Sequence, residues 1–258
     1  MFNPKTERIK SIAENSLKTI EGLNSLFGVS SRIYIDYANV RPWSEKLGWH
    51  IDIKRLKQFL DSFDTVKAVN FYSGYLHNDD QSKKEIKEAE NQKYLVRTKQ
   101  VKAMRFSIDM SSIARDSTAI LSHFIRRALL RKYEVGTIEY LNERFGDMNK
   151  KGEYYIEDRK CNFDVEITTD IILDSELNKA ETFILWSGDS DFVDPIKKLL
   201  KNGRGVILFA TTRKVSRELS YLVKDGLFIF DIQKIKNFIC WKREIECKGD
   251  PFKGAPKL

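Results

Sequence analysis

Short apolar runs alternate with amphipathic segments along most of the chain. Residues 32–35, 66–72, 94–104, 182–187, 205–210 and 227–231 have the length and the aliphatic and aromatic content of buried strands. Between them, residues 52–63, 82–92, 164–174, 192–201 and 215–224 place apolar side chains at helical spacing. Strands separated by helices in this way predict an α/β fold, in which a parallel sheet carries helices on both faces.

Three segments depart from this alternation. Residues 1–30 have the pattern of one amphipathic helix, which we expect to pack on the body as an N-terminal arm. Residues 105–157 exceed what the sheet needs. They combine a helical pattern with the glycine-punctuated, hairpin-like stretch FGDMNKKGEYYIE, so we predict a mainly helical insertion within a domain spanning 31–240. Residues 241–258 are predicted to be a loose basic tail.

The charge balance favours a polyanionic partner. The 258 residues include 45 Lys and Arg against 37 Asp and Glu, a net charge of +8, and such a surface attracts phosphate backbones. A merely lysine-rich protein would show the same balance. Cys161, Cys240 and Cys247 form no C-x-x-C pair, and neither an export signal nor an apolar run of membrane-spanning length is present. We therefore predict a cytoplasmic protein with free thiols.

Acidic side chains follow two of the predicted strands. Asp36 ends the first strand, Asp189 and Asp191 follow the strand at 182–187, and Asp164 starts the helix before that strand. The carboxyl ends of parallel strands line the ligand crevice of open α/β sheets, so these acids are expected to meet there. Two carboxylates ~4 Å apart repel by about 4 kcal/mol at an effective dielectric near 20, which a divalent cation would relieve. Oxygen ligands of this kind favour Mg²⁺ or Mn²⁺.

Each of these positions also has a purely structural explanation. Asp36 can end a strand, Asn39 can shape a turn, and Asp164 or Asp191 can serve a helix start. Only their joint placement at one sheet edge favours a metal site. Asp170 lies six residues beyond Asp164, about 120° round the helix axis, so we expect it either to support the metal ligands without binding the ion or to have a structural role.

Three stretches of the sequence resemble the NYN domain, a branch of the PIN-like nuclease superfamily. They are IYIDYANV, DRKCNFDVEITTDIILD and ILWSGDSDFVDPIKKLLKNGRGVILFATTRKVSREL. The resemblance implies a Rossmann-like, PIN-like sheet and a metal-dependent ribonuclease centre. By position, Asp36, Asp164, Asp189 and Asp191 match the acidic cluster of the family. Asn39 matches its asparagine, and Ser187 matches the small hydroxyl residue before the glycine.

Two features depart from the family pattern. The family has a shorter Lys-Gly-Val-Asp run where this chain has Lys160-Cys161-Asn162-Phe163-Asp164, so the local loop is expected to differ. The segment 105–157 exceeds the family core, so substrate choice is not inherited. The sequence also leaves the oligomeric state open, a homodimer included.

The predicted function is hydrolysis of RNA by water activated on Mg²⁺ or Mn²⁺, with Asp36, Asp164, Asp189 and Asp191 as ligands and Asn39 beside them. We expect endonucleolytic cleavage. Arg213, Lys214 and Arg217 follow a predicted strand end on the same rim, and with Ser187 they are the candidate nucleic-acid contacts. The three histidines are scattered and form no catalytic pair.

Other functions remain open from the sequence. One is a binding module that holds RNA or a protein partner without cutting, although clustered acids would then repel phosphate. Another is a DNA nuclease or structure-specific nuclease, because recognition of the 2′-hydroxyl depends on geometry. A phosphohydrolase with an aspartyl nucleophile is disfavoured, since Ala38 stands two residues after Asp36 where the second acid is needed.

Overall fold

The computed structural model describes residues 1–75, 79–107, 113–151, 155–211 and 215–245. Two compact units form the chain. Met1–Gln100 and Cys161–Leu258 make the first unit, and Val101–Lys160 makes the second. The boundaries predicted from the sequence for the arm, the domain and the tail stay predictions.

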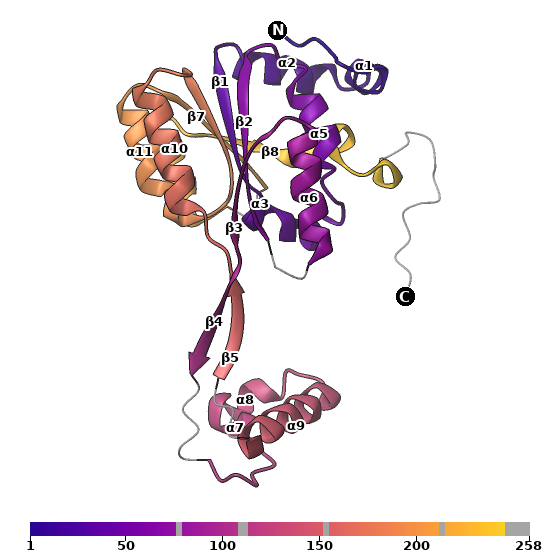
Figure 1. Ribbon diagram of the computed structural model, residues 1–258, viewed down its shortest axis with the longest axis vertical. Helices are drawn as coiled ribbons and strands as arrows, with labels where there is room; N and C mark the ends of the chain where they lie inside the picture. The colour runs from indigo at the N-terminus through magenta and orange to yellow at the C-terminus, as the bar shows by residue number, and fades with distance from the viewer. Residues whose placement is uncertain (76–78, 108–112, 152–154, 212–214, 246–258) are drawn as a thin grey trace. The chain divides into compact units, whose positions relative to one another are not determined.

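A six-stranded sheet organises the first unit (Figure 1). Its order is β3-β2-β1-β6-β7-β8, and every neighbouring pair is parallel. The strands are β1 (Ser31–Asp36), β2 (Val66–Tyr75), β3 (Leu95–Gln100), β6 (Thr182–Trp186), β7 (Gly205–Ala210) and β8 (Phe228–Asp231). Strand β6 is buried throughout, as its uninterrupted apolar run predicts.

Helices lie on both sides of this sheet. In Figure 1, α5 (Ile53–Leu60) and α6 (Asp80–Asn91) lie on one side, and α10 (Asp164–Glu176) and α11 (Val193–Lys201) on the other. The predicted α/β fold with a parallel sheet between helices is therefore confirmed. Gly203 follows the end of α11 with φ +73°, a left-handed conformation that favours glycine.

Short helical segments connect the strands to these helices. The α-helices are α3 (Tyr37–Val40), α4 (Ser44–Leu47), α12 (Arg217–Tyr221) and α13 (Lys236–Ile239). The 3₁₀ turns are η1 (Arg41–Trp43), η2 (Ser190–Phe192), η3 (Leu222–Asp225), η4 (Ile232–Ile235) and η5 (Lys242–Glu244). Segment η5 belongs to the predicted loose tail, yet Trp241 donates its backbone N–H to the carbonyl of His50 at 3.2 Å, and Ile245 packs against the core.

The N-terminal segment is not the single helix that the pattern predicted. It forms α1 (Glu7–Glu14) and α2 (Leu17–Leu26). The break falls at Asn15 and Ser16, where the Asn15 side chain donates to the Ser11 carbonyl and Ser16 leaves helical geometry at φ −134°. Ile9 and Leu23 are fully buried, so both helices still pack on the core.

The predicted strand at 94–104 is also divided. Strand β3 ends at Gln100, opposite Tyr75 at the end of β2. The chain then forms β4 (Lys102–Ser107), which pairs antiparallel with β5 (Tyr155–Lys160) in the second unit. The strand pattern was correct, but it covers two strands that pair with different partners.

The second unit is mainly helical apart from this strand pair. It holds α7 (Leu121–Phe124), α8 (Arg127–Leu130) and α9 (Val135–Lys151). The hairpin-like interpretation of 145–157 was wrong for its first half, because residues 145–151 continue α9 through Gly146. One glycine costs a helix about 1 kcal/mol, which the helix-forming residues around it offset.

Candidate metal centre

Two neighbouring strands bring their acidic ends together. Strands β1 and β6 are parallel, with Ile35 opposite Trp186, so Asp36 and Ser187 follow at the same edge of the sheet. The Ser187 hydroxyl donates to Asp36 Oδ2 at 3.3 Å and accepts the backbone N–H of Asp189 at 3.3 Å. Ser187 is fully buried, so one hydroxyl joins the ends of both strands.

Three of the four predicted aspartates form one compact group. Asp164, Asp189 and Asp191 each offer a carboxylate oxygen, and these oxygens all lie within 4.8 Å of one another. Local hydrogen bonds hold the loops that carry them. Asp189 Oδ1 accepts the backbone N–H of Asp191 at 3.2 Å, and the Asn162 side chain accepts the backbone N–H of Asp164 at 2.8 Å.

Asp36 lies outside this group of three but next to it. It is only 3% exposed, and its Oδ1 accepts the backbone N–H of Asn39 at 3.3 Å, which starts α3. Burial raises the pKa of Asp36 to about 7. Repulsion from Asp164 and Asp189 adds to the increase, and the hydrogen bonds from Asn39 and Ser187 oppose it. The structure therefore couples Asp36 to the group electrostatically and through Ser187.

Asp164 has the strongest features of a metal ligand. Burial raises its pKa to about 6, and repulsion from Asp189 and Asp191 contributes, against the effect of the Asn162 side chain. Its Oδ2 atom is buried and accepts no hydrogen bond from any described residue. A buried, unpartnered carboxylate oxygen beside two further carboxylates is a donor set that suits a hard divalent cation. The residues present thus fit Mg²⁺ or Mn²⁺.

A pocket of about 380 Å³ opens beside this group. It is lined by Asn39, Trp43, Gly188, Asp189, Ser190 and Ser216. The indole N–H of Trp43 donates to Asn39 Oδ1 at 3.3 Å, and Trp43 is 1% exposed. This contact occupies the amide oxygen of Asn39 and leaves its Nδ2 group as the donor. Asn39 is thus held at the pocket wall by a side chain one turn further along the chain.

The predicted nucleic-acid contacts are only partly described. Arg213 and Lys214 lie outside the described residues. Arg217 is exposed at the start of α12, directly after Ser216, whose backbone N–H donates to the Gly188 carbonyl at 3.2 Å. The fourth, Ser187, is buried with its hydroxyl engaged by Asp36 and Asp189.

Sequence reasoning did not single out Asn162. It considered Trp43 for base stacking or packing and Ser216 for a helix cap, but not their contacts with Asn39 and Gly188. Asn162 stands two residues before Asp164, the spacing at which an asparagine side chain accepts a backbone N–H. Trp43 stands four residues after Asn39, the spacing of neighbours on a helix face. These spacings could have indicated both contacts. The placement of Ser216 beside Gly188 depends on tertiary structure.

Asp170 lies away from the group of three carboxylates. It accepts the Tyr72 hydroxyl at 2.7 Å and pairs with Arg97 at 3.1 Å. These contacts join α10 to β2 and β3, which is the structural one of the two roles expected from its angle on the helix.

The parallel sheet, with aspartates at the carboxyl ends of β1 and β6 and at the start of α10, defines an α/β protein with a PIN-like nuclease fold. Comparison with protein families then gives a match to the NYN domain over residues 138–230. This similarity to a nuclease-like, RNA-related family covers 93 of the 258 residues. The matched range includes Asp164, Asp189 and Asp191, and Asp36 precedes it.

Two further similarities extend over more of the chain. The Low amplitude and bright protein LabA of Synechococcus elongatus is 22% identical over 228 residues, which cover 88% of this chain and 94% of LabA. A crystal structure of a protein of unknown function from Vibrio parahaemolyticus is 16% identical, with a TM-score of 0.49. The match covers 83% of this chain and 96% of that one. Among the described residues, no helix is both long and apolar enough to cross a membrane.

Proposed function

We propose that this protein is a ribonuclease that depends on Mg²⁺ or Mn²⁺ and cleaves RNA internally. The observation that carries the proposal is the group of Asp164, Asp189 and Asp191, with oxygens within 4.8 Å and one of them buried without a partner. The match of residues 138–230 to the NYN domain, a nuclease-like, RNA-related family, and the net charge of +8 support the choice of substrate.

In this proposal the three carboxylates hold the cation, and Asp36 supports them from the end of β1. A bound Mg²⁺ or Mn²⁺ lowers the pKa of a water and stabilises charge on the phosphate under attack. Asp191 is the exposed member of the three, and we assign to it the orientation of the attacking water. Asn39, held by Trp43, presents an amide donor to the phosphate at the pocket wall.

The surrounding residues define where the substrate lies. Arg217 begins α12 beside the pocket, and the segment with Arg213 and Lys214 precedes it, so we assign these side chains to the phosphate backbone. We place the protein in the cytoplasm, where the free thiols Cys161 and Cys240 stay reduced.

The test uses single-stranded RNA and DNA oligonucleotides labelled at one end. We expect internal cleavage of RNA with Mn²⁺ or Mg²⁺, no cleavage with EDTA, and little cleavage of DNA. Asp164→Asn should abolish cleavage, because it removes charge from the buried ligand and leaves its shape. The matched control is Asp194→Asn, a side chain 94% exposed on α11, which should cleave as the parent does.

Three outcomes would contradict this function. Cleavage in EDTA would exclude the metal, and cleavage of DNA alone would change the substrate. Binding of RNA without cleavage under every metal condition would favour a binding module, the alternative that the sequence left open.

A further inference from the structure

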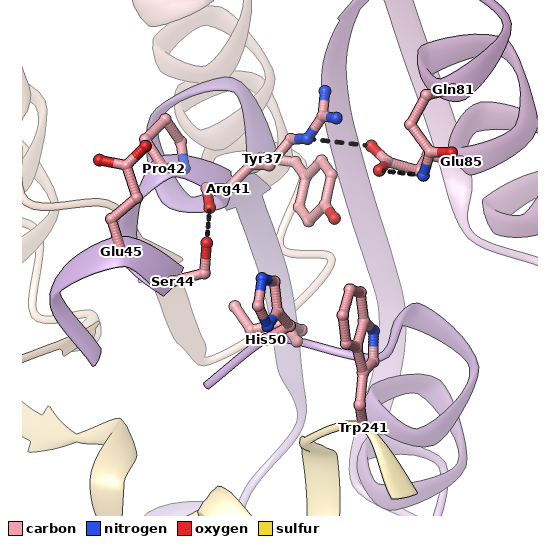
Figure 2. A pocket seen from close by; sticks show the side chains of 10 residues that line it. Tyr37, Arg41, Pro42, Ser44, Glu45, His50, Gln81, Glu85 and Trp241 are labelled. Carbon is pink, nitrogen blue, oxygen red and sulfur yellow. Dashed lines mark hydrogen bonds and ion pairs between the residues drawn. The ribbon is translucent and has the colours of Figure 1, made fainter. Parts of the chain in front are cut away.

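A second pocket shares the segment 37–45 with the pocket beside the carboxylates, and nothing in the proposed chemistry uses it. Its volume is about 470 Å³, and we call it the Arg41 pocket. Side chains from four separate segments line it, among them Tyr37, Arg41, His50, Glu85 and Trp241. Figure 2 shows Arg41 and Tyr37 on one side of the pocket, with His50 and Trp241 opposite them.

One short helical segment separates the two pockets. Tyr37 and Arg41 are four residues apart and line the Arg41 pocket, whereas Asn39 and Trp43, also four apart, line the pocket beside the carboxylates. Residues two positions apart in a helix point about 200° from each other, so α3 and η1 present opposite faces to the two pockets. The Arg41 pocket therefore lies about one helix width from the candidate metal centre.

Arg41 is held in a position that suits a phosphate. Its Nε atom lies 3.3 Å from Glu85 Oε2, and the other oxygen of Glu85 accepts the Gln81 amide at 3.0 Å (Figure 2). Within the described part of the chain, the two terminal nitrogens of Arg41 have no hydrogen bond or ion pair. A guanidinium fixed at Nε presents its terminal pair as a fork that matches two oxygens of one phosphate.

Opposite Arg41, two flat rings form a rigid wall. The rings of His50 and Trp241 stack with centroids 4.0 Å apart and planes 5° from parallel. The Glu244 carboxylate accepts the backbone N–H of His50 and contacts the ring Nδ1 of His50, both at 2.8 Å. The Arg243 guanidinium lies 4.6 Å from the indole centroid of Trp241. The His50 side chain is 44% exposed, so the stack ends in an accessible aromatic face at the pocket.

We propose that the Arg41 pocket binds one nucleotide of the single-stranded RNA substrate, next to the nucleotide that is cut. Arg41 holds its phosphate, and its base stacks on His50. A stacking face together with one arginine fork is the chemistry by which proteins bind unpaired nucleotides. Glu45 and Glu85 line the same pocket and disfavour a ligand with several negative charges, which selects a single phosphodiester over a polyphosphate. The choice of RNA rests on the proposed function.

Binding measured in EDTA tests this assignment without cleavage. Fluorescence anisotropy of a labelled single-stranded RNA is titrated with the full chain at several salt concentrations. Arg41→Gln removes one phosphate contact, so the slope of log affinity against log salt should become shallower by about 0.7. His50→Ala should lower the affinity about fivefold or more, since stacking of one base is lost, and should leave that slope unchanged.

Two control variants and a second ligand complete the experiment. His50→Phe keeps a ring on Trp241 and should restore part of the affinity that His50→Ala loses. Lys10→Gln removes an exposed charge on α1 and should leave the slope nearly unchanged. If Arg41→Gln does not fold, Arg41→Met gives the same readout, because it also removes the charge and keeps an unbranched side chain. Adenosine 5′-monophosphate serves as the free nucleotide.

Equal RNA affinity and equal salt slope in Arg41→Gln, His50→Ala and the parent would overturn the proposal. If Arg41→Gln or His50→Ala lost binding of adenosine 5′-monophosphate but bound RNA as the parent does, the pocket would be assigned to a free nucleotide. That result would also overturn the proposal. A chain that binds RNA through Arg41 and His50 but cleaves none with Mn²⁺ would contradict the ribonuclease function and leave this subsite standing.

Discussion

Replacing Asp189 by asparagine tests whether the carboxylates repel one another in the absence of a cation. Asp189 has two acidic partners within 4.8 Å, Asp164 and Asp191. At that separation each pair repels by about 0.9 kcal/mol at the dielectric constant of water, and by more where water is excluded. Asparagine still offers an oxygen to the backbone N–H of Asp191, so the turn at η2 keeps its cap.

In EDTA we therefore expect Asp189→Asn to be more stable than the parent by about 1–2 kcal/mol. For a chain of this size, each kcal/mol corresponds to a Tm change of about 2–4 °C. With Mn²⁺ this advantage should shrink or disappear, because a cation at 100 times its Kd stabilises the parent by about 2.7 kcal/mol. A variant that binds the cation tenfold more weakly loses about half of that gain.

The assay is calorimetric or fluorescence-detected unfolding of both proteins in EDTA and in a series of Mn²⁺ concentrations. Asp194→Asn is the control, because it makes the same charge change on α11 at a side chain that is 94% exposed. If Asp189→Asn were less stable than the parent in EDTA, or gained as much from Mn²⁺, the carboxylates would not form a shared cation site.

Three further predictions concern single side chains. The pKa of Asp36 is raised to about 7 from 3.8, so in EDTA the folded state loses stability as pH rises between these values. Urea unfolding should show that the stability of Asp36→Asn relative to the parent is about 2–3 kcal/mol greater at pH 8 than at pH 5. The same difference at both pH values would contradict burial of a charge at this position as the cause. Trp43→Phe removes the donor to Asn39 but keeps a ring, so RNA cleavage should fall while the Mn²⁺-dependent Tm shift is retained; unchanged cleavage would show that Asn39 needs no such support. Asp174→Asn breaks contacts of a 6% exposed carboxylate with Arg32, Lys179 and the Tyr34 hydroxyl, and should cost about 3 kcal/mol in the free energy of unfolding; a loss under about 1 kcal/mol would mean that these contacts are screened.

The sequence predicted the sheet better than the segments at its edges. Central strands such as β6 are buried on both faces, so their apolar runs have one interpretation. The edge strand β3 is largely exposed, and its end at Gln100, opposite Tyr75 of β2, is not marked in the local sequence pattern. The break at Asn15–Ser16 likewise depends on local hydrogen bonds, which hydrophobic spacing does not capture.

The part of the candidate site that follows the ends of strands could be predicted from the sequence. Asp36, Asp189 and Asp191 follow apolar strands, and parallel strands place such residues at one edge. Asp164 comes from a helix start, so its distance from the others depends on how α10 packs on the sheet. That packing is set by contacts such as Tyr34 with Asp174 and Tyr72 with Asp170, between residues 140 and 98 positions apart. Sequence spacing could not give those contacts.

The second pocket was missed for a related reason. His50 and Trp241 are far apart in sequence, and each has an ordinary surface pattern around it. Only the antiparallel bridge between Ile51 and Cys240 brings them to stacking distance.

The single hydroxyl of Ser187 makes the tips of β1 and β6 mechanically dependent on each other. A lateral slip of either strand would stretch the 3.3 Å hydrogen bond from Ser187 to Asp36, while the bond from Asp189 to Ser187 lies within the loop after β6. Displacement of the β1 tip is therefore transmitted through Ser187 to the loop that carries Asp189. Ser187→Ala would remove both of these hydrogen bonds and with them the side-chain link between the ends of β1 and β6.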